Sequence, residues 1–295
     1  MHHRMILAAG VFGVMSVLTT AGAQETQPAP ASFRSDVRMG VYVYDDDSSP
    51  ARELGRMPAA SPIEIPVGRE WEVSLSAADF AAAKDALVAQ LTELGRRKLC
   101  PTVGLTDGAT DADVEALAKV EGLTALAVDA GKITDKALAR MATMSGLREI
   151  RLTWCRRLTP GGVAALGALP ALSRLSVDGC AGMSNDLAAK LRAFPALKNL
   201  TLSGEALDAR CLGDLGELKA LESLHLLDAR WLRDEHMAKI AQMKALTELN
   251  LAGCNGLRGP GLAALAALPP LKTFAGSRWR NSPRCAACGC RTARD

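Results

Sequence analysis

Aromatic side chains are scarce in this chain. Phe, Trp and Tyr together make up 4% of the 295 residues, although 48% of the residues are hydrophobic. Leucine and alanine supply most of the apolar content, because so few bulky rings are present. Aromatic rings contribute much of the buried area in a large mixed core. Their scarcity therefore favours many short and similar helices over one bulky core.

Groups that usually carry out catalysis are also sparse. Only four histidines occur, and two of them, His2 and His3, lie at the extreme N-terminus. No serine or cysteine can be matched with the nearby base and supporting acid that a nucleophilic site requires. The stretch "GRRKLCPTVG" has the wrong order and spacing for a Gly-rich phosphate loop. The sequence thus argues against an enzyme, and no cofactor is expected.

An excess of charge of one sign is also absent. The formal net charge is +3, and loss of Arg4 with an N-terminal segment would lower it to +2. Binding of nucleic acid depends on a concentrated basic face, so no nucleic-acid partner is predicted. The exception is the tail, residues 278–295, where Asp295 alone opposes five arginines: Arg278, Arg280, Arg284, Arg291 and Arg294.

A single long apolar run is present, near the N-terminus. Met5 to Leu18 carries no charge, and Ala21-Gly22-Ala23 fits the small-x-small pattern for cleavage before Gln24. Residues 1–23 are therefore predicted to be a signal peptide. An uncleaved anchor is the alternative, but the run is short for a span of about 20 residues. Export would lead to the periplasm or the exterior, with no membrane span left after cleavage.

Two short regions are predicted to follow the signal peptide. Residues 24–36 are rich in Pro and Ala and are predicted to be a flexible linker. Residues 37–98 are predicted to form a small α+β cap. Its first strand is "VRMGVYVYDDD", and "IEIPVGREWEVSL" is a second strand-like run. Pro66 and Gly68 interrupt that run, which indicates an edge strand or a bulged strand.

A helix is expected to close the cap. Ser76 is a candidate N-cap with Asp79 three residues later, an imperfect capping box. Gly95 is expected to end the helix. Its apolar positions share one helical face: Phe80, Leu87, Leu91 and Leu94.

The rest of the chain is repetitive. Segments such as "LREIRLTWCRRLTPGGVAALGALPA" and "LTELNLAGCNGLRGPGLAALAALPP" can be aligned on their first leucine. A step of 24 or 25 residues between them marks a stack of supersecondary units. The leading positions are Leu123, Leu147, Leu172, Leu197, Leu221, Leu246 and Leu271. A degenerate earlier turn is visible in "ATDADVEALAKVEGL".

The pattern within each unit predicts its structure. LxxLxL alternates as a short strand does, with leucines pointing inward and the x residues pointing outward. N-cap residues such as Thr134 and Ser184-Asn185-Asp186 then begin a helix of two to three turns. One unit cannot bury its apolar face, so stacked units share a continuous core. The predicted fold class is α/β, an arc-shaped solenoid with parallel inner strands, outer helices and the small N-terminal α+β cap.

These units resemble leucine-rich repeats. The pattern "LxLxxCxxLxxxGLxxLxxLPxL" over residues 99–277 is similar to the cysteine-containing and Gly-Ala-Leu-Ala classes of bacterial repeats. Such repeats occur in ubiquitin-ligase adaptors and in bacterial envelope or effector proteins. The resemblance implies a solenoid that binds a partner and carries out no reaction. No F-box-like segment accompanies the repeats.

Three cysteines occupy one position of the repeat. Cys155, Cys180 and Cys254 each follow the last apolar residue of a predicted strand by three positions. A small, weakly polar side chain at such a turn can pack inside and bond a backbone carbonyl. Cys155 and Cys180 lie on adjacent turns, but strands about 4.8 Å apart hold parallel Cβ atoms farther apart than the ~3.8 Å mean for a disulfide. Free, packed thiols are therefore predicted.

The tail contains a separate cluster of cysteines. Cys285, Cys288 and Cys290 form a CxxCxC sequence beyond the last repeat. A CxxC with a third cysteine can hold zinc or an iron–sulfur centre, but four ligands are usual and no fourth is near. No metal is predicted, and these cysteines are kept as weak candidates. Oxidation within the tail or with another chain is the simpler reading.

The outward positions of the predicted strands define a candidate binding face. They carry both charges, small hydroxyls and one histidine, with a tryptophan at the edge, and they suit a protein segment or, alternatively, a glycan. An inner surface that merely keeps the protein soluble is the other reading. The candidate residues are Glu149, Arg151, Trp154, Arg174, Ser176, Asp178, Asn199, Thr201, His225 and Asn250.

The sequence therefore predicts a non-catalytic scaffold that binds a protein through the concave face of the arc, in the bacterial envelope or exterior. One alternative is a metal- or redox-linked protein that uses the CxxCxC tail. Another is a purely architectural repeat protein.

Overall fold

The computed structural model describes residues 31–44, 51–66, 69–203, 207–258, 260–268, 271–275 and 291–292. The predicted signal peptide and Cys285, Cys288 and Cys290 lie outside these residues, and the domain limits inferred from the sequence stay predictions. The chain divides into two compact units, residues 1–133 and residues 134–295, which are described separately. Among the described residues, no helix is both long and apolar enough to cross a membrane.

Unit 1 is built on a mixed sheet. β2 (Met39–Tyr44) pairs antiparallel with β3 (Arg52–Met57) and with β5 (Glu70–Ser76). β5 then pairs in parallel with β6 (Thr102–Thr106), and β6 with β7 (Ala125–Asp129). The helices α1 (Ala77–Arg96) and α2 (Asp111–Leu117) connect the parallel strands. One face of the sheet supplies core residues: Val41, Val43, Val73, Leu75, Val103 and Leu105.

The second predicted strand of the cap divides into two strands in different sheets. β4 (Ile63–Ile65) pairs antiparallel with β1 (Ala31–Phe33), and β5 lies between β2 and β6. The prediction of an edge or bulged strand was wrong for β5, because Pro66 follows β4 and precedes β5, so it removes no hydrogen bond from either ladder. β1 lies within the range expected to be a linker, and Phe33 packs edge-on against Trp71.

The helix of the cap begins where the sequence predicts. The Ser76 hydroxyl accepts a hydrogen bond from the Asp79 backbone N–H (3.3 Å) and donates one to the Asp79 carboxylate (2.8 Å). Gly95 does not end the helix, which continues to Arg96. Gly95 is needed for close packing instead, since a Cβ there would lie 1.8 Å from the carbonyl oxygen of Glu121. The predicted apolar face is buried: Phe80, Leu87, Leu91 and Leu94.

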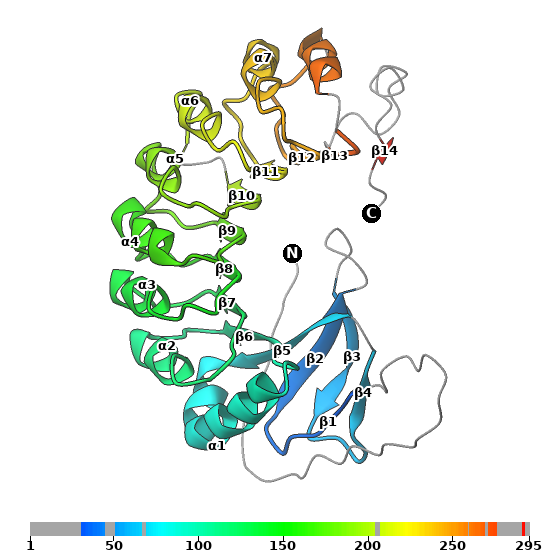
Figure 1. Ribbon diagram of the computed structural model, residues 1–295, viewed down its shortest axis with the longest axis vertical. Helices are drawn as coiled ribbons and strands as arrows, with labels where there is room; N and C mark the ends of the chain where they lie inside the picture. Colours follow the sequence, from blue (N-terminus) through cyan, green and yellow to red (C-terminus); the bar gives the residue numbers. More distant parts are fainter. Residues whose placement is uncertain are drawn as a thin grey trace. The chain divides into compact units, whose positions relative to one another are not determined.

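Unit 2 is a leucine-rich-repeat solenoid. Its strands pair in parallel in chain order, each displaced from the next by one repeat. The strands line the inner side of the curve and the helices the outer side (Figure 1). The strands are β8 (Glu149–Thr153), β9 (Arg174–Asp178), β10 (Asn199–Ser203), β11 (Ser223–Leu227), β12 (Glu248–Asn250) and β13 (Thr273–Ala275), with β14 (Arg291–Thr292) beside β13.

The buried positions confirm the sequence register. The leading leucines of unit 2 are at most 7% exposed. Leu200 and Leu224, predicted as core, are 1% and 0% exposed, whereas Thr201 and His225 are half-buried on the other face. Because each repeat adds one layer of leucines to the same core, no single repeat could bury them alone. The α/β fold class and the solenoid are therefore confirmed.

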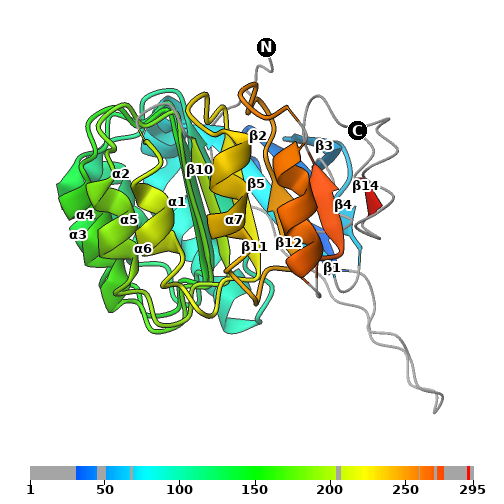
Figure 2. The same ribbon diagram turned by 90° about the horizontal axis from the view of Figure 1, so that it is seen from above.

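The helices of unit 2 are shorter than the predicted two to three turns. The α-helices contain four to seven residues, and 3₁₀ turns extend or replace them. A repeat of 24 or 25 residues must also supply a strand and two turns, which leaves little chain for a helix. The elements are α3 (Asp135–Met141), α4 (Pro160–Ala165), η1 (Leu166–Ala168), α5 (Asp186–Leu191), α6 (Cys211–Leu215), η3 (Asp234–His236), α7 (Met237–Ile240) and η4 (Pro260–Ala267). Seen from above, α3, α4, α5 and α6 lie together on one side of β10 (Figure 2).

Polar side chains at the helix starts join one repeat to the next. Asp135 accepts hydrogen bonds from the backbone N–H (3.0 Å) and hydroxyl (2.7 Å) of Thr159, 24 residues later. Asp234 accepts one from the backbone N–H of Arg258 (3.1 Å). Thr134 caps α3 as predicted, through the Lys136 N–H. These contacts brace the stack along its turns.

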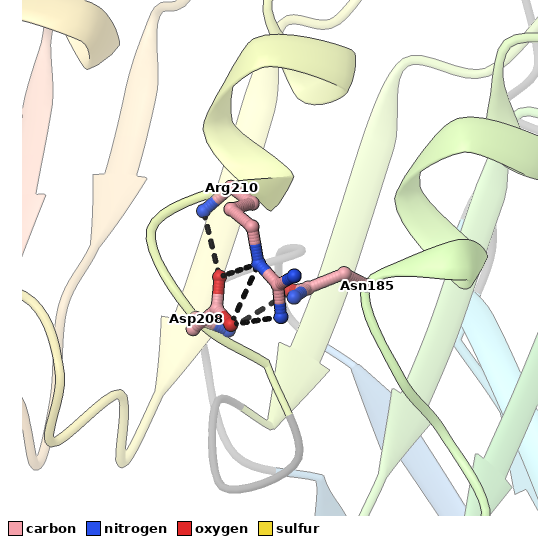
Figure 3. Close-up of polar contacts among 3 residues, drawn as sticks. All are labelled: Asn185, Asp208 and Arg210. Atoms are coloured by element: carbon pink, nitrogen blue, oxygen red, sulfur yellow. Dashed lines mark hydrogen bonds and ion pairs between the residues drawn. The ribbon is translucent and has the colours of Figure 1, made fainter.

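The predicted N-cap at Ser184-Asn185-Asp186 is only partly right. Asn185 is the N-cap residue of α5, but its side chain makes no capping hydrogen bond. Its Oδ1 instead accepts from the backbone N–H of Asp208 (2.9 Å) in the next repeat (Figure 3). Arg210 holds the Asp208 carboxylate through its Nε and its second terminal nitrogen, at 3.0 and 2.7 Å. Hydrogen bonds from Arg210 lower the pKa of Asp208 well below its usual range.

The repeated cysteines pack inside the turns, as predicted. Cys155, Cys180 and Cys254 are free thiols and at most 4% exposed. The Cys254 Sγ lies 3.2 Å from the Leu226 carbonyl oxygen, and the Cys180 Sγ lies 3.4 Å from that of Asp178. Burial raises the pKa of Cys254 to about 11. The pKa of Cys180 is also raised. The main cause is a hydrogen bond with Cys155, and burial is the second cause.

Candidate binding face

The outward side chains of the unit 2 strands form three rows across the sheet. The register places Glu149 beside Arg174, Arg151 beside Ser176, and Thr153 beside Asp178. We call these rows the first, middle and last polar rows. The first row is Glu149, Arg174, Asn199, Ser223 and Glu248; the middle row is Arg151, Ser176, Thr201, His225 and Asn250; the last row is Thr153, Asp178, Ser203 and Leu227. All are half-buried except Ser223, which is buried.

One carboxylate pairs with two guanidinium groups across this face. The Arg174 Nε donates a hydrogen bond to Glu149 Oε2 at 2.7 Å. The Arg151 Nε lies 3.1 Å from Glu149 Oε1, an ion pair that lacks the angle of a hydrogen bond. The Glu149 side chain is 12% exposed, against 25% for Arg151 and 30% for Arg174. Glu149 therefore bridges Arg151 and Arg174, which lie on neighbouring strands.

A second polar cluster joins Ser223, His225 and Glu248. The His225 Nε2 lies 3.2 Å from the Ser223 hydroxyl and 3.3 Å from Glu248 Oε1. The Ser223 hydroxyl also donates to Glu248 Oε2 at 3.1 Å. In a catalytic triad the acid and the serine contact opposite ring nitrogens. Here both contact the same nitrogen, so the arrangement differs from a triad, and the two side chains hold the imidazole in place.

Trp154 stands out at the end of β8. Trp154 is 51% exposed, and among the described residues it is the one large hydrophobic residue that is exposed. Its backbone is left-handed, with φ of 55°. A left-handed residue other than glycine costs about 1–3 kcal/mol.

The same backbone conformation recurs at the equivalent position of other described repeats. Gly179, Asp228 and Gly253 have φ of 61°, 51° and 74° at positions equivalent to Trp154. A Cβ on Gly179 would lie 2.5 Å from Cε3 of the Trp154 ring, so the indole rests on a bare backbone. The Trp154 N–H also donates to the Asp178 carbonyl oxygen at 2.8 Å. The ring is thus fixed on the neighbouring repeat, with half of its surface open to solvent.

The remaining candidates have simpler surroundings. The Asn250 Oδ1 accepts from the backbone N–H of Ala252 (3.0 Å), which stabilises the turn after β12. Ser176, Asn199 and Thr201 are half-buried side chains in the middle of the face. His236, which is outside the candidate set, is mostly buried. Its side chain is 16% exposed and its Nδ1 accepts from the Arg233 backbone N–H (3.0 Å) at the start of η3.

Two residues outside the candidate set also contact a candidate residue on this face. Ser223 and Glu248 lie in the first polar row and fix His225, although the sequence offered no reason to rank them above their neighbours. The sequence feature that could have identified them is the alternation of the strand, which places both residues on the same face as His225. The described residues include no group of three or more potential metal ligands. The cysteines of the tail lie outside them.

Similarity to known proteins is weak. No family model matches the chain, and no curated protein matches it. Among solved structures, an internalin from Listeria monocytogenes is similar, with 19% identity and a TM-score of 0.42. The match covers 65% of this chain and 58% of the internalin chain. The assignment of the leucine-rich-repeat fold rests on the strand register and buried leucines described above.

Proposed function

We propose that this protein is an exported, non-catalytic scaffold that binds a protein partner through the concave face of its repeats. The observation that carries the proposal is the three polar rows of unit 2, which place residues from successive strands on one continuous surface. Extended surfaces of this kind are what repeat solenoids use for binding. The prediction that residues 1–23 direct export supports a partner in the envelope or outside the cell.

The partly ordered charges favour protein recognition. Glu149 holds Arg151 and Arg174 in place before any partner arrives, which reduces the side-chain entropy lost on binding. The guanidinium group can then present its remaining donors to a carboxylate or stack on a ring. The face includes the candidate residues predicted from the sequence, with Trp154 at its rim. A glycan that uses the same hydroxyls and charges is the alternative ligand.

A photo-cross-linking experiment tests the proposal in the producing cell. A photoreactive amino acid is placed at Thr201, in the middle of the face, or at Lys190, an exposed helix position. We expect a discrete cross-linked protein from Thr201 and none from Lys190. The triple variant Glu149→Gln, Arg151→Gln and Arg174→Gln should reduce that product, because it removes the charges of both arginines together with that of Glu149, which pairs with them.

Two results would contradict the proposal. Equal cross-linking from Thr201 and Lys190 would show that the concave face has no special part in binding. A folded protein with no cross-linked product from Thr201 would favour an architectural role. Circular dichroism of each purified variant controls for loss of fold.

A further inference from the structure

The rim of the face around Trp154 carries an unusual concentration of positive charge. The stretch Leu147–Leu158 contains four arginines and one glutamate. The equivalent stretches 172–183 and 197–207 each contain one basic and one acidic residue. Residues 221–232 contain two acidic residues and one arginine, and residues 246–257 contain one glutamate alone. Among these five stretches, only the one that holds the exposed tryptophan has an excess of positive charge.

The two arginines that follow Trp154 face solvent. Cys155 is buried in the turn, whereas Arg156 and Arg157 are both exposed. Neither has an ion pair with any described residue, whereas Glu149 already offsets Arg151 and Arg174. Two exposed cations next to a fixed aromatic ring form a site with net positive charge and an apolar platform.

We propose that Trp154, Arg156 and Arg157 anchor an acidic, extended segment of the protein partner. This inference rests on the proposed function and specifies which chemistry the partner presents. Aspartate or glutamate side chains of the segment pair with the arginines, since guanidinium groups bind carboxylates with two parallel hydrogen bonds. An aromatic or aliphatic side chain of the same segment stacks on the open face of the indole.

The anchor fits a protein segment because of the residue types that it combines. Tryptophan and arginine are the residues that most often dominate the energy of protein interfaces. The indole is already fixed on Gly179, so binding does not have to immobilise it. A neutral glycan would leave both arginines without a partner, which makes it a poor match to this repeat. An acidic glycan would satisfy them, and the experiment below separates it from a peptide.

Fluorescence anisotropy with defined probes tests the assignment on the purified full chain. The first probe is a short fluorescein-labelled peptide of alternating Glu and Ser with one central Tyr. The second has Gln in place of every Glu, and the third has Ser in place of the Tyr. Polygalacturonate oligomers, which are acidic but not peptides, serve as competitors.

We expect the acidic peptide to bind at least ~10-fold more tightly than its Gln counterpart. Arg156→Glu with Arg157→Glu should weaken binding at least ~10-fold, the effect of removing dominant contacts. The matched control, Lys190→Glu with Lys239→Glu, makes the same charge change on exposed helix positions and should alter affinity less than ~2-fold. In Trp154→Ala, replacing the Tyr of the probe should cause no further loss, because the two rings act as a pair.

Several outcomes overturn the inference. Equal weakening in the rim and control variants would reveal general charge attraction. Equal binding of the Glu and Gln peptides would remove the acidic segment as the ligand. Displacement of the peptide by polygalacturonate at lower concentration, with loss in the same rim variants, would assign the site to an acidic glycan. If cross-linking from Thr201 persists while rim variants have no effect, the rim assignment fails and the proposed function stands.

Discussion

The Trp154 indole lies directly against Gly179, so that a Cβ added to Gly179 would be 2.5 Å from the Cε3 atom of the ring. Both residues have left-handed backbone conformations, and they occupy the same position in successive repeats. The glycine is required twice, once for its own φ of 61° and once for the room that the ring needs. The rim therefore depends on a pair of residues in which one accommodates the other.

Gly179→Ala should destabilise the protein and disturb the ring. The left-handed backbone alone costs an alanine about 1–2 kcal/mol, and overpacking against the indole adds to it. Denaturation in urea measures the loss, and near-ultraviolet circular dichroism reports the ring. Gly213→Ala is the control, because it lies in α6 with no atom within 4 Å of the added Cβ. We expect Gly213→Ala to leave stability unchanged or to raise it slightly. If Gly179→Ala were as stable as Gly213→Ala, the packing of the indole on Gly179 would be refuted.

Leu224→Ala should be among the costly substitutions in unit 2. Leu224 is 0% exposed and lies between Leu200 and Leu249 in the strand register. Removal of a buried leucine side chain costs about 2–5 kcal/mol through the cavity that it leaves. The neighbouring Thr201→Ala, on the polar face, should cost less than ~1 kcal/mol. Urea denaturation of both variants tests the prediction, and similar midpoints for the two would contradict the assigned register.

The repeat could be predicted from the sequence because its signal is redundant. Seven leucines at steps of 24 or 25 residues fix which side of every strand is buried, and the observed strand pairs match that register. The cap carries no such redundancy. β3 has the sequence RELGRM, whose charges hide a strand, and Pro66 was misleading because it lies between strands. In the repeats, each copy of the pattern supports the assignment of the others, whereas each strand of the cap has to be assigned from its own sequence.

The candidate face was also only partly predictable. Strand alternation indicates which side chains share a surface, so the polar rows follow from the sequence. Alternation also places Glu149 on the same face as Arg151 and Arg174, but the distances of its two ion pairs depend on side-chain conformation, which the sequence does not give. The left-handed φ of Trp154 was also hidden, since tryptophan is not a residue that favours this conformation.

The buried thiols should be protected in the native protein and become reactive on unfolding. Thiolates react and thiols do not, and burial raises the pKa of Cys254 to about 11 and that of Cys211 to about 12. Alkylation under native conditions at pH 8, followed by peptide mass spectrometry, should leave Cys155, Cys180, Cys211 and Cys254 unmodified. The same reagent in denaturant without reductant should modify all four. Recovery of a Cys155–Cys180 disulfide would contradict the free-thiol assignment.

The same pKa values predict how stability changes at high pH. A thiol with a raised pKa in the folded state keeps its proton when the unfolded chain, with an ordinary pKa near ~8.5, has lost it. The folded state then binds more protons, so stability falls as pH rises from about 8.5 towards about 11. Cys254→Ala and Cys211→Ala should flatten this decline when unfolding midpoints are compared between pH 8 and pH 10. An unchanged slope in both would mean that other groups cause it.

The shared carboxylate of Glu149 should make arginine substitutions on the face costlier than the substitution of all three charges. Arg151→Gln with Arg174→Gln leaves a carboxylate that is 12% exposed without either cation, and an unsatisfied buried group costs about 1–3 kcal/mol. Adding Glu149→Gln replaces that carboxylate by a neutral amide. A neutral amide costs less free energy to bury than an unpaired carboxylate. The triple variant should therefore be more stable than the double variant by about 1 kcal/mol.

Urea denaturation at pH 7 compares the double and triple variants directly, and a repeat at high salt provides the control. Screening weakens exposed ion pairs more than half-buried ones, so most of the difference should survive in 1 M NaCl. Loss of the whole difference in salt would show that the three side chains interact only through solvent. In that case Glu149 would not hold the arginines in place for a partner, and preorganised charges would not contribute to binding by the concave face.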